Sequence, residues 1–539
     1  MDDQGIIDLG DLRVMPYRAN PENCINSIQD FIELDTKINR RLSYYELHSF
    51  LIKIHDILLE HQESNKLFPF TAIAGIMSKY VILNSDIAGG WSPIFDGDFL
   101  YFLNMIFSCS LYDPEFEGRS QHTNDDFASL LLRKIGSQVR WNIQLHNLWG
   151  RTFYIYGELI KERDTPDLIR DIVASKFEEK FGISLIDFIK LGFMVFCGSQ
   201  QPGPMNRKYF DVARRQKLPI PGDDTIMTFL DLISVNSLTF RKICANNVYI
   251  NNYLKTYKFN PLFDYPLIRL NYGDAKRLAR YDEFIAPVPQ LLAYRFTTGL
   301  YYQLFNAFGE NKFSDSFGLL FEHYVNDLLQ WYNLPGKVIS ENEIRPNLRP
   351  PKGQHIKIPD WVIFCEEGVI LLECKATKYS QEIYEQGLNA SESAKGCIRQ
   401  LNKGINQLTS FEQYIPKIMK AYHISGKRLP IKKVIITFEP LGALNKGPLR
   451  KWMNIEQKNE KDCKVIWIWY LEEIQPYITK GASLWSFLVD FEKLELGEFD
   501  EIIKKMQSET GAGYSDSVLC KYEDEFCNEL SKDATHHPK

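Results

Sequence analysis

One stretch decides the fold: Ile358-Pro359-Asp360-Trp361-Val362-Ile363-Phe364, then Cys365-Glu366-Glu367-Gly368, then Val369-Ile370-Leu371-Leu372-Glu373-Cys374-Lys375. Two apolar runs rich in Val, Ile, Phe and Trp, separated by a short polar stretch with glycine, are typical of a β-hairpin. The first run follows Asp360, and the second ends in Glu373 and Lys375. The sequence therefore predicts two paired strands that carry two carboxylates and one ammonium group.

The length of the hairpin loop decides whether these side chains meet. A two-residue loop at Glu366-Glu367 sets Asp360 opposite Glu373, and a loop at Glu367-Gly368 sets it opposite Lys375 instead. Both registers place all three side chains on one face, because residues alternate faces along a strand and opposed residues share one, with Cβ atoms about 4.5–5.5 Å apart. A three-residue loop without a bulge would send Asp360 to the other face.

The Glu-x-Lys tripeptide gains weight from the apolar residues before it. The run from Val369 to Leu372 marks a strand that is buried on both faces. A carboxylate and an ammonium group at the end of such a strand are costly to bury unless they are paired or bound to a metal ion. Two interpretations stay open from the residues alone: a metal site and a structural salt bridge.

The order of these residues resembles the PD-(D/E)XK, or restriction-endonuclease-like, nuclease superfamily. Its pattern is a Pro-Asp strand followed by a strand that ends in Glu-x-Lys, and Pro359-Asp360 with Glu373-Cys374-Lys375 match it. The resemblance covers roughly residues 311–490. It implies a nuclease in which Asp360, Glu373 and the carbonyl of Cys374 bind Mg²⁺ or Mn²⁺. It also implies that Lys375 positions or helps deprotonate the attacking water.

A helix is predicted before the hairpin. The segment from Ser314 to Leu329 has apolar residues at the i, i+3, i+4, i+7 spacing of one helix face. Glu322 borders that face and can lean toward the hairpin, where members of the superfamily often place an additional carboxylate. We therefore include Glu322 among the catalytic and metal-binding candidates. The alternative is an ordinary glutamate at the edge of an apolar face.

A second helix is predicted after the hairpin. Its apolar face consists of Ala394, Cys397, Ile398, Leu401, Ile405 and Leu408. Gln400, Lys403 and Gln407 fall together on an adjoining face. Many members of the superfamily carry a glutamine near this position that resembles Gln400 and contacts metal-bound water or the phosphate backbone. Gln400 is our catalytic candidate, and a solvated helix face is the alternative for both glutamines.

Two later apolar runs, Val434–Phe438 and Val465–Tyr470, are predicted strands that complete a mixed sheet. The order helix, strands, helix, strands predicts an α/β or α+β fold with helices packed on the sheet. The resemblance implies a restriction-endonuclease-like sheet flanked by helices.

The domain organisation follows from the same patterns. The chain has 539 residues, of which 45% are hydrophobic, so it should hold more than one domain. We expect a nuclease domain at 311–500, preceded by a large, mostly helical region and followed by a polar C-terminal tail at 501–539, which is loosely held from about Gly511 onward. The helical region divides into an N-terminal part, 1–200, and a helical or linker part, 201–310. Helical periodicity is clearest at residues 44–59, 126–135 and 168–195.

Composition narrows the function classes. The net charge of −6 does not indicate general nucleic-acid binding, so any such surface must be local. Ten cysteines without a C-x-x-C pair, and ten histidines without ligand spacing, argue against zinc. The acidic start and the lack of an 18-residue apolar run predict a cytoplasmic protein with no membrane contact. The sequence has no P-loop, so we expect no P-loop ATPase.

Basic residues gather in two places. Residues 395–433 contain nine Lys or Arg and one acidic residue. From this stretch we select Lys403, Lys427 and Arg428 as nucleic-acid-binding candidates. The Pro/Gly-bracketed loop near residues 198–222 adds Arg207 and Arg214 beside aromatic residues. Solvated surface is the alternative for both groups.

Together these features predict a Mg²⁺- or Mn²⁺-dependent nuclease that hydrolyses phosphodiester bonds, with DNA favoured over RNA because the superfamily mostly cuts DNA. A nuclease domain behind a large helical region resembles bacterial anti-phage defence or restriction effectors. Its partners would then be DNA and either a second copy of the chain or another defence subunit. The alternative is a non-catalytic scaffold or nucleic-acid-binding subunit that keeps the nuclease fold.

Overall fold

The computed structural model describes residues 7–8, 13–14, 25, 27–60, 67–85, 93–111, 145, 147–162, 164–216, 218–246, 260–270, 283–348, 356–377, 390–424, 429–441, 463–493 and 499–532.

A five-stranded mixed sheet forms the centre of the C-terminal half. Its strands, in spatial order, are β11 (Cys463–Trp467), β10 (Ile431–Thr437), β9 (Val369–Lys375), β8 (Trp361–Phe364) and β7 (Lys337–Ser340). Strands β7, β8 and β9 pair antiparallel, whereas β9, β10 and β11 pair parallel. The predicted mixed sheet flanked by helices is therefore present.

The hairpin has the register of a Glu366-Glu367 loop. Trp361 pairs with Leu372, and Phe364 pairs with Val369. The turn closes through a hydrogen bond in which the Cys365 N–H donates to the Gly368 carbonyl at 2.9 Å. Gly368 allows a close approach, because a Cβ there would lie 2.7 Å from the Pro430 carbonyl oxygen. Of the two in-register loops weighed above, the structure selects the one that sets Asp360 opposite Glu373.

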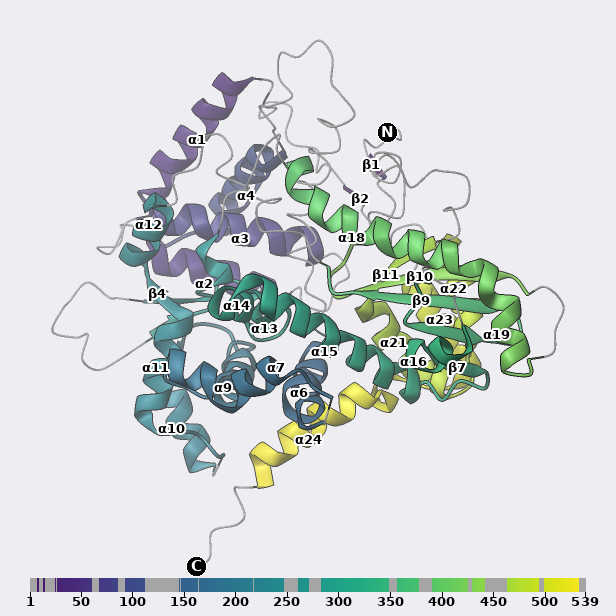
Figure 1. Cartoon of the computed structure of the whole chain (residues 1–539). Helices are drawn as coiled ribbons and strands as arrows, with labels where there is room; N and C mark the ends of the chain where they lie inside the picture. Colours follow the sequence, from purple (N-terminus) through teal and green to yellow (C-terminus); the bar gives the residue numbers. More distant parts are fainter. Residues whose placement is uncertain are drawn as a thin grey trace, which may run out of the picture.

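Helices cover both faces of the sheet (Figure 1). Helix α18 (Ala390–Phe411) and α19 (Ile415–Ala421) pack on the face that presents Val362, Leu371 and Ile435. Helix α15 (Glu310–Trp331) and α21 (Ile468–Thr479) pack on the face that presents alternate residues such as Leu372 and Cys374. Predicted helices on both sides of the hairpin are thus confirmed.

The region before α15 is mostly helical, as predicted. Its helices are α1 (Ile28–Leu42), α2 (Leu47–Glu60), α3 (Leu67–Asn84), α4 (Asp96–Leu111), α6 (Leu148–Phe153), α7 (Asp167–Asp171), α8 (Phe177–Phe181), α9 (Leu185–Gly198), α10 (Lys208–Arg215), α11 (Asp223–Ile233), α12 (Ser237–Asn246), α13 (Gln290–Phe296) and α14 (Thr298–Phe308). The π-helical segments η3 (Tyr154–Glu158) and η5 (Ile172–Lys176) continue α6 and α7. The predicted helix at 126–135 lies outside the described residues.

A small four-stranded sheet accompanies these helices. Its order is β3 (Met205–Asn206), β6 (Glu283–Ile285), β5 (Leu267–Arg269) and β4 (Ser234–Asn236). Helices α1 to α4 share one apolar core with this part of the chain, including Phe240, Ile268 and Leu291. Buried residues between 31 and 109 therefore share one core with buried residues between 235 and 294.

A second apolar core runs across the boundary predicted at residue 310. It includes Phe188 and Phe296 from the helical region together with Tyr324, Leu372 and Ile474 from the sheet domain. The sheet domain and the helical segment that begins near residue 148 are therefore packed on a shared core.

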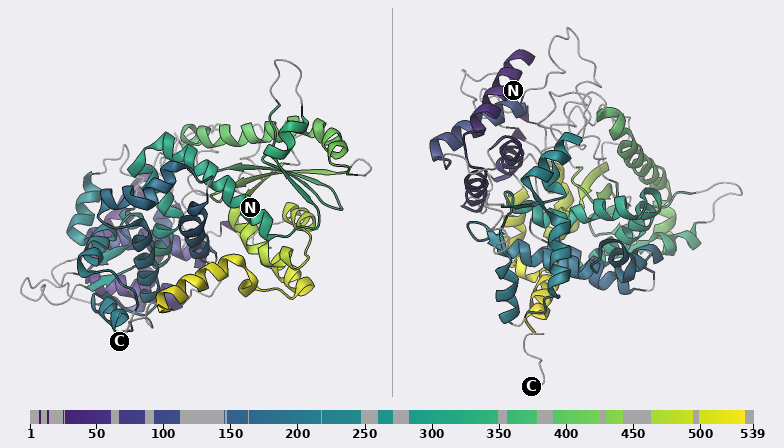
Figure 2. Two further views of the ribbon diagram at one scale, coloured as in Figure 1. Left: turned by 60° about the horizontal axis from the view of Figure 1, so that its bottom comes forward. Right: turned by 90° about the vertical axis from the view of Figure 1, so that its left-hand side faces the viewer.

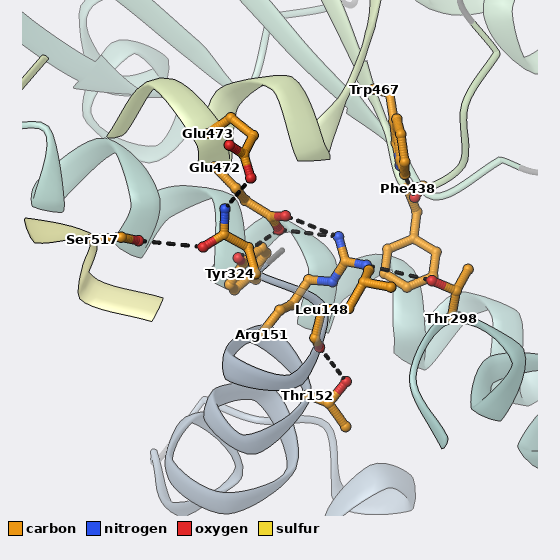
Figure 3. A network of polar contacts seen from close by, with 11 residues as sticks. Leu148, Arg151, Thr152, Thr298, Tyr324, Phe438, Trp467, Glu472, Glu473 and Ser517 are labelled. Carbon is orange, nitrogen blue, oxygen red and sulfur yellow. Dashed lines mark hydrogen bonds and ion pairs between the residues drawn. The ribbon is translucent and has the colours of Figure 1, made fainter. Parts of the chain in front are cut away.

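A buried polar network joins the same two parts (Figure 3). Arg151 on α6 donates hydrogen bonds to both carboxylate oxygens of Glu472 on α21, at 3.1 and 3.2 Å. The Tyr324 hydroxyl on α15 donates to Glu472 Oε1 at 2.7 Å. Asn147 donates to the neighbouring Glu473 at 2.7 Å. The side chains of Arg151 and Glu472 are 3% and 0% exposed, so this ion pair is enclosed by protein.

Two expectations about the C-terminal part are wrong. Ile468, Trp469 and Tyr470 begin helix α21 and do not extend strand β11. After helix α22 (Leu484–Lys493), the described residues around and beyond 500 also form helices, α23 (Phe499–Thr510) and α24 (Val518–Lys532).

Helix α24 is held by aromatic packing. Phe526 stacks on Phe153 with ring centroids 3.7 Å apart, and it also meets Phe193 at 5.6 Å. Figure 1 shows α24 lying beside α6, far from it in sequence. The mostly polar composition of this segment gave no clear signal of its apolar contacts. Instead of the predicted loose tail, the chain forms a packed helix as far as Lys532.

Within the described ranges, no single helix is both long and apolar enough to cross a membrane. One pair bent by 74°, residues 167–181 with 185–198, passes the same test together.

Candidate active site

Asp360 lies one residue before strand β8 and is held by the backbone of two neighbours. The Cys374 N–H donates to Asp360 Oδ2 at 2.6 Å. The Glu341 N–H donates to the Asp360 carbonyl at 2.8 Å. Continuing the register from the Trp361–Leu372 pair puts Asp360 opposite Glu373. Its carboxylate therefore reaches the end of β9, where the predicted partners lie.

Glu373 is buried at 2% exposure, and each of its carboxylate oxygens has a partner. The Lys375 ammonium donates to Glu373 Oε1 and, at 3.1 Å, to the Cys374 carbonyl. The Gln407 amide donates to Glu373 Oε2 at 2.6 Å and to the Ile358 carbonyl at 2.7 Å. Gln407 therefore ties helix α18 to the end of β9 and to the residues that lead into β8.

Helix α18 approaches this strand end through Gly404. A Cβ at that position would lie 3.2 Å from Ile435 Cδ1, 3.5 Å from Lys375 Cε and 3.6 Å from Glu373 Cγ. The glycine thus lets the helix backbone come close to the two charged side chains. Sequence analysis missed Gly404, although a glycine in the interior of a strongly amphipathic helix is itself a sign of a packing requirement.

Glu322 comes to the same end of the sheet from α15. Burial, followed by the charge of Asp360, raises the pKa of Glu322 to about 7, while the charge of Lys375 opposes that rise. These influences require Glu322 to lie near both groups. No hydrogen bond joins Glu322 to Asp360 or Lys375 in the described structure, and its part in the site stays a prediction.

The electrostatics of the site favour a cation. Burial raises the pKa of Asp360 to about 6, and burial together with the Asp360 charge raises the pKa of Glu373 to about 8. Burial works to lower the pKa of Lys375, but Glu373 and Asp360 outweigh it, so the pKa rises and the ammonium form is favoured. One ammonium group lies near three carboxyl groups, of which Glu373 is buried and Asp360 and Glu322 are half-buried. A bound cation would relieve the cost of ionising them.

The donor set suits a hard divalent ion in part. Carboxylate oxygens of Asp360 and Glu373 and the carbonyl of Cys374 are the kind of ligand that Mg²⁺ and Mn²⁺ prefer. The Cys374 thiol packs in the core on the opposite face, and burial holds its pKa well above the usual range, so this residue offers its carbonyl. Among the described residues, no three His, Cys, Asp or Glu side chains are grouped to hold a metal ion. The set therefore rests on two carboxylates and one main-chain oxygen, with Glu322 outside it.

The two glutamines of α18 have different surroundings. Gln407 contacts Glu373, whereas Gln400 lies two turns earlier and is exposed. The sequence placed both on one adjoining face. Their contacts differ because the helix crosses the strand end near Gly404, and only the turn around Gly404 is close to Glu373.

Of the five nucleic-acid-binding candidates, three lie among the described residues and two do not. Lys403 is exposed on α18, one turn before Gln407. Lys427 and Arg428 lie outside the described residues. Arg207 and Arg214 belong to an ordered segment around α10, and both contact the Asp223 carboxylate, at 3.3 and 2.5 Å. A phosphate would have to compete with that carboxylate.

No protein-family model matches this chain, and neither a curated protein nor a solved structure matches it.

Proposed function

We propose that this protein is a divalent-metal-dependent nuclease that hydrolyses phosphodiester bonds, with DNA as the favoured substrate. The observation that carries the proposal is the hairpin register. It brings Asp360 opposite Glu373, with Lys375 bonded to Glu373 on the same face of the sheet. The mixed sheet with helices on both faces supports the finer assignment to the restriction-endonuclease-like fold.

The geometry favours a metal site over the salt-bridge interpretation. A structural salt bridge would need only Glu373 and Lys375. Here a second, half-buried carboxylate, Asp360, is fixed beside them by the Cys374 N–H, and half-buried Glu322 adds to the carboxyl crowding. Crowding of these carboxyl groups beside one lysine makes their ionised forms costly, and a bound cation would lower that cost.

Asp360, Glu373 and the Cys374 carbonyl would hold the ion. A divalent ion bound there would neutralise charge on the scissile phosphate and acidify a bound water. Lys375, favoured as an ammonium, donates hydrogen bonds and offsets negative charge that develops on the phosphate. Gln407 fixes the orientation of the Glu373 carboxylate, the part that an outer-shell residue plays around a metal ligand.

A role in bacterial defence against foreign DNA belongs to the same proposal. Its support is the resemblance of residues 311–490 together with the large helical region that precedes them. The shared core and the Arg151–Glu472 ion pair offer a physical route by which binding to that region could reach the sheet domain.

The function is tested by a substrate panel. The purified full-length protein is incubated with supercoiled plasmid, linear duplex, single-stranded DNA and RNA, each with Mg²⁺, Mn²⁺ or EDTA. We expect metal-dependent cleavage of DNA that is lost in EDTA. The matched variants are Glu373→Gln and Glu366→Gln, since both remove one charge from the same hairpin and Glu366 is exposed in the turn. Equal activity of the two variants, or cleavage in excess EDTA, would contradict the proposal.

A further inference from the structure

Helix α18 carries a row of side chains that ends at the candidate active site. Lys395, Arg399, Lys403 and Gln407 are spaced four residues apart along the helix. The first three are exposed, and Gln407 contacts Glu373. The row therefore begins as an exposed basic strip and finishes at a carboxylate of the site.

The helix geometry gives this row a regular spacing. Four residues advance an α-helix by about 6 Å and turn it by about 40°, so successive members are neighbours and the row winds about 120° around the helix between Lys395 and Gln407. A step of that length is comparable to the separation of successive phosphates along one nucleic-acid strand. Lys403 is then one step from Gln407, and Lys395 is three steps from it.

Other basic residues of the same stretch are committed to carboxylates. Lys432 pairs with Glu492 at 2.7 Å, and Lys433, only 2% exposed, pairs with Glu412 at 3.0 Å. In the described part of the chain, Arg399 and Lys403 form no ion pair. The basic excess predicted from sequence thus includes two lysines paired with carboxylates, two exposed lysines on α19 (Lys417 and Lys420), and the exposed strip on α18.

The placement of the strip fits a path toward the site. Figures 1 and 2 show the N-terminal half of α18 extending past the edge of the five-stranded sheet toward the helical region. A strand lying along that half would reach the end of β9 at Lys375.

We propose that the N-terminal half of α18 is a phosphate track that guides one strand of DNA along Arg399 and Lys403 to the Glu373 end of the sheet. The direction of the track, from Lys395 toward Gln407, rests on the proposed nuclease function. The binding itself does not depend on it. The contacts are to phosphates, so the track should be insensitive to base sequence.

The test compares two double variants of equal charge. Arg399→Ala/Lys403→Ala removes the track, and Lys417→Ala/Lys420→Ala removes two exposed lysines from the nearby helix α19. Binding of a fluorescein-labelled DNA duplex, a single strand and an RNA of the same sequence is measured by anisotropy in EDTA across a range of NaCl concentrations. EDTA keeps cleavage out of the measurement.

We expect the track variant to lower the slope of log Kd against log salt concentration by about 1.8 for duplex DNA, or about 1.4 for a single strand. The α19 variant should keep the wild-type slope. The charge-retaining variant Arg399→Lys should bind as the wild type does. The inference would be overturned if the two double variants behaved alike, or if the track variant kept the wild-type slope. It would also be overturned if the protein bound RNA in preference to DNA.

The outcome is separable from that of the nuclease assay. Track-dependent DNA binding by a protein that never cuts DNA would support the inference and contradict the proposed function. Metal-dependent cleavage by the wild type, together with an unchanged DNA affinity in the track variant, would support the proposed function and contradict the inference.

Discussion

Glu373 is the residue on which the account of the site depends. Its two oxygens are held by Lys375 and Gln407, and the opposed Asp360 is held by the backbone of Cys374. Asp360, Glu373 and Lys375 are thus each held by a hydrogen bond from or to a neighbour in the sheet or on α18. The site is therefore pre-organised by β8, β9 and α18 before any substrate arrives.

At this scale, Gln407→Ala should lower metal-dependent activity by about 10- to 100-fold, because loss of an outer-shell hydrogen bond lets the Glu373 carboxylate reorient. Gln400→Ala, an exposed change in the same helix, serves as the matched control and should leave the rate within about twofold. Steady-state rates at several Mg²⁺ concentrations separate a weaker metal affinity from a slower reaction. A larger loss in Gln400→Ala than in Gln407→Ala would show that the wrong glutamine has been assigned.

Metal binding can also be measured without turnover. Titration calorimetry with Mn²⁺ should show binding to the wild type that weakens by about tenfold or more in Glu373→Gln, since a charged oxygen ligand becomes a neutral amide. Glu366→Gln should bind as the wild type does. Identical isotherms for all three proteins would remove Glu373 from the ligand set.

At the scale of elements, the helices and strands that were predicted correctly are those with a clear apolar pattern or turn signal in the sequence. The hairpin was recognisable from two continuous apolar runs, and α15 and α18 from apolar residues that recur at helical spacing. Ile468–Tyr470 was misassigned because a short apolar run rich in aromatics is compatible with both strand and helix. Helix α24 was missed because its apolar contacts, led by Phe526, are few and meet a partner far away in sequence.

Glu473 on helix α21 should make the stability of the fold depend on pH. Burial, and then the charge of Glu472, raises the pKa of Glu473 to about 8, whereas an unfolded glutamate titrates near 4.3. The folded state binds the proton more tightly, so this group reduces stability as pH rises from about 4.3 through about 8. Glu473→Gln keeps an acceptor for Asn147 and should flatten that decline in melting temperature between pH 5 and 9 by several degrees. The exposed control Glu501→Gln should leave the decline unchanged, and a steeper decline in Glu473→Gln would contradict the assignment.

At the scale of the whole molecule, the helical region and the sheet domain share a core and a buried ion pair. That arrangement could not be predicted from sequence, because nothing in the local pattern around Arg151 shows that its partner is Glu472, more than 300 residues away. The predicted boundary at residue 310 follows a change in local pattern. The core instead follows contacts that only the folded chain reveals.

Breaking this ion pair should cost stability. Arg151→Ala leaves the Glu472 charge buried beside Tyr324 alone, and we expect a loss of about 3–5 kcal/mol. Lys161→Ala, which breaks an exposed pair with Glu158, should cost less than about 1 kcal/mol. Thermal melting of both variants checks this, and equal melting temperatures would show that the buried pair contributes nothing particular to the fold.

The central claim is that the end of strand β9 is a phosphodiester-cleaving site, and cleavage of supercoiled plasmid by Lys375→Ala tests it most directly. Lys375 contacts both Glu373 and the Cys374 carbonyl, whereas Lys357, exposed three residues before Asp360, provides the control Lys357→Ala. With Mg²⁺ present and circular dichroism showing a native fold, we predict that Lys375→Ala loses activity by about a hundredfold or more, while Lys357→Ala retains the wild-type rate. A folded Lys375→Ala variant that cuts plasmid at the wild-type rate would contradict the claim.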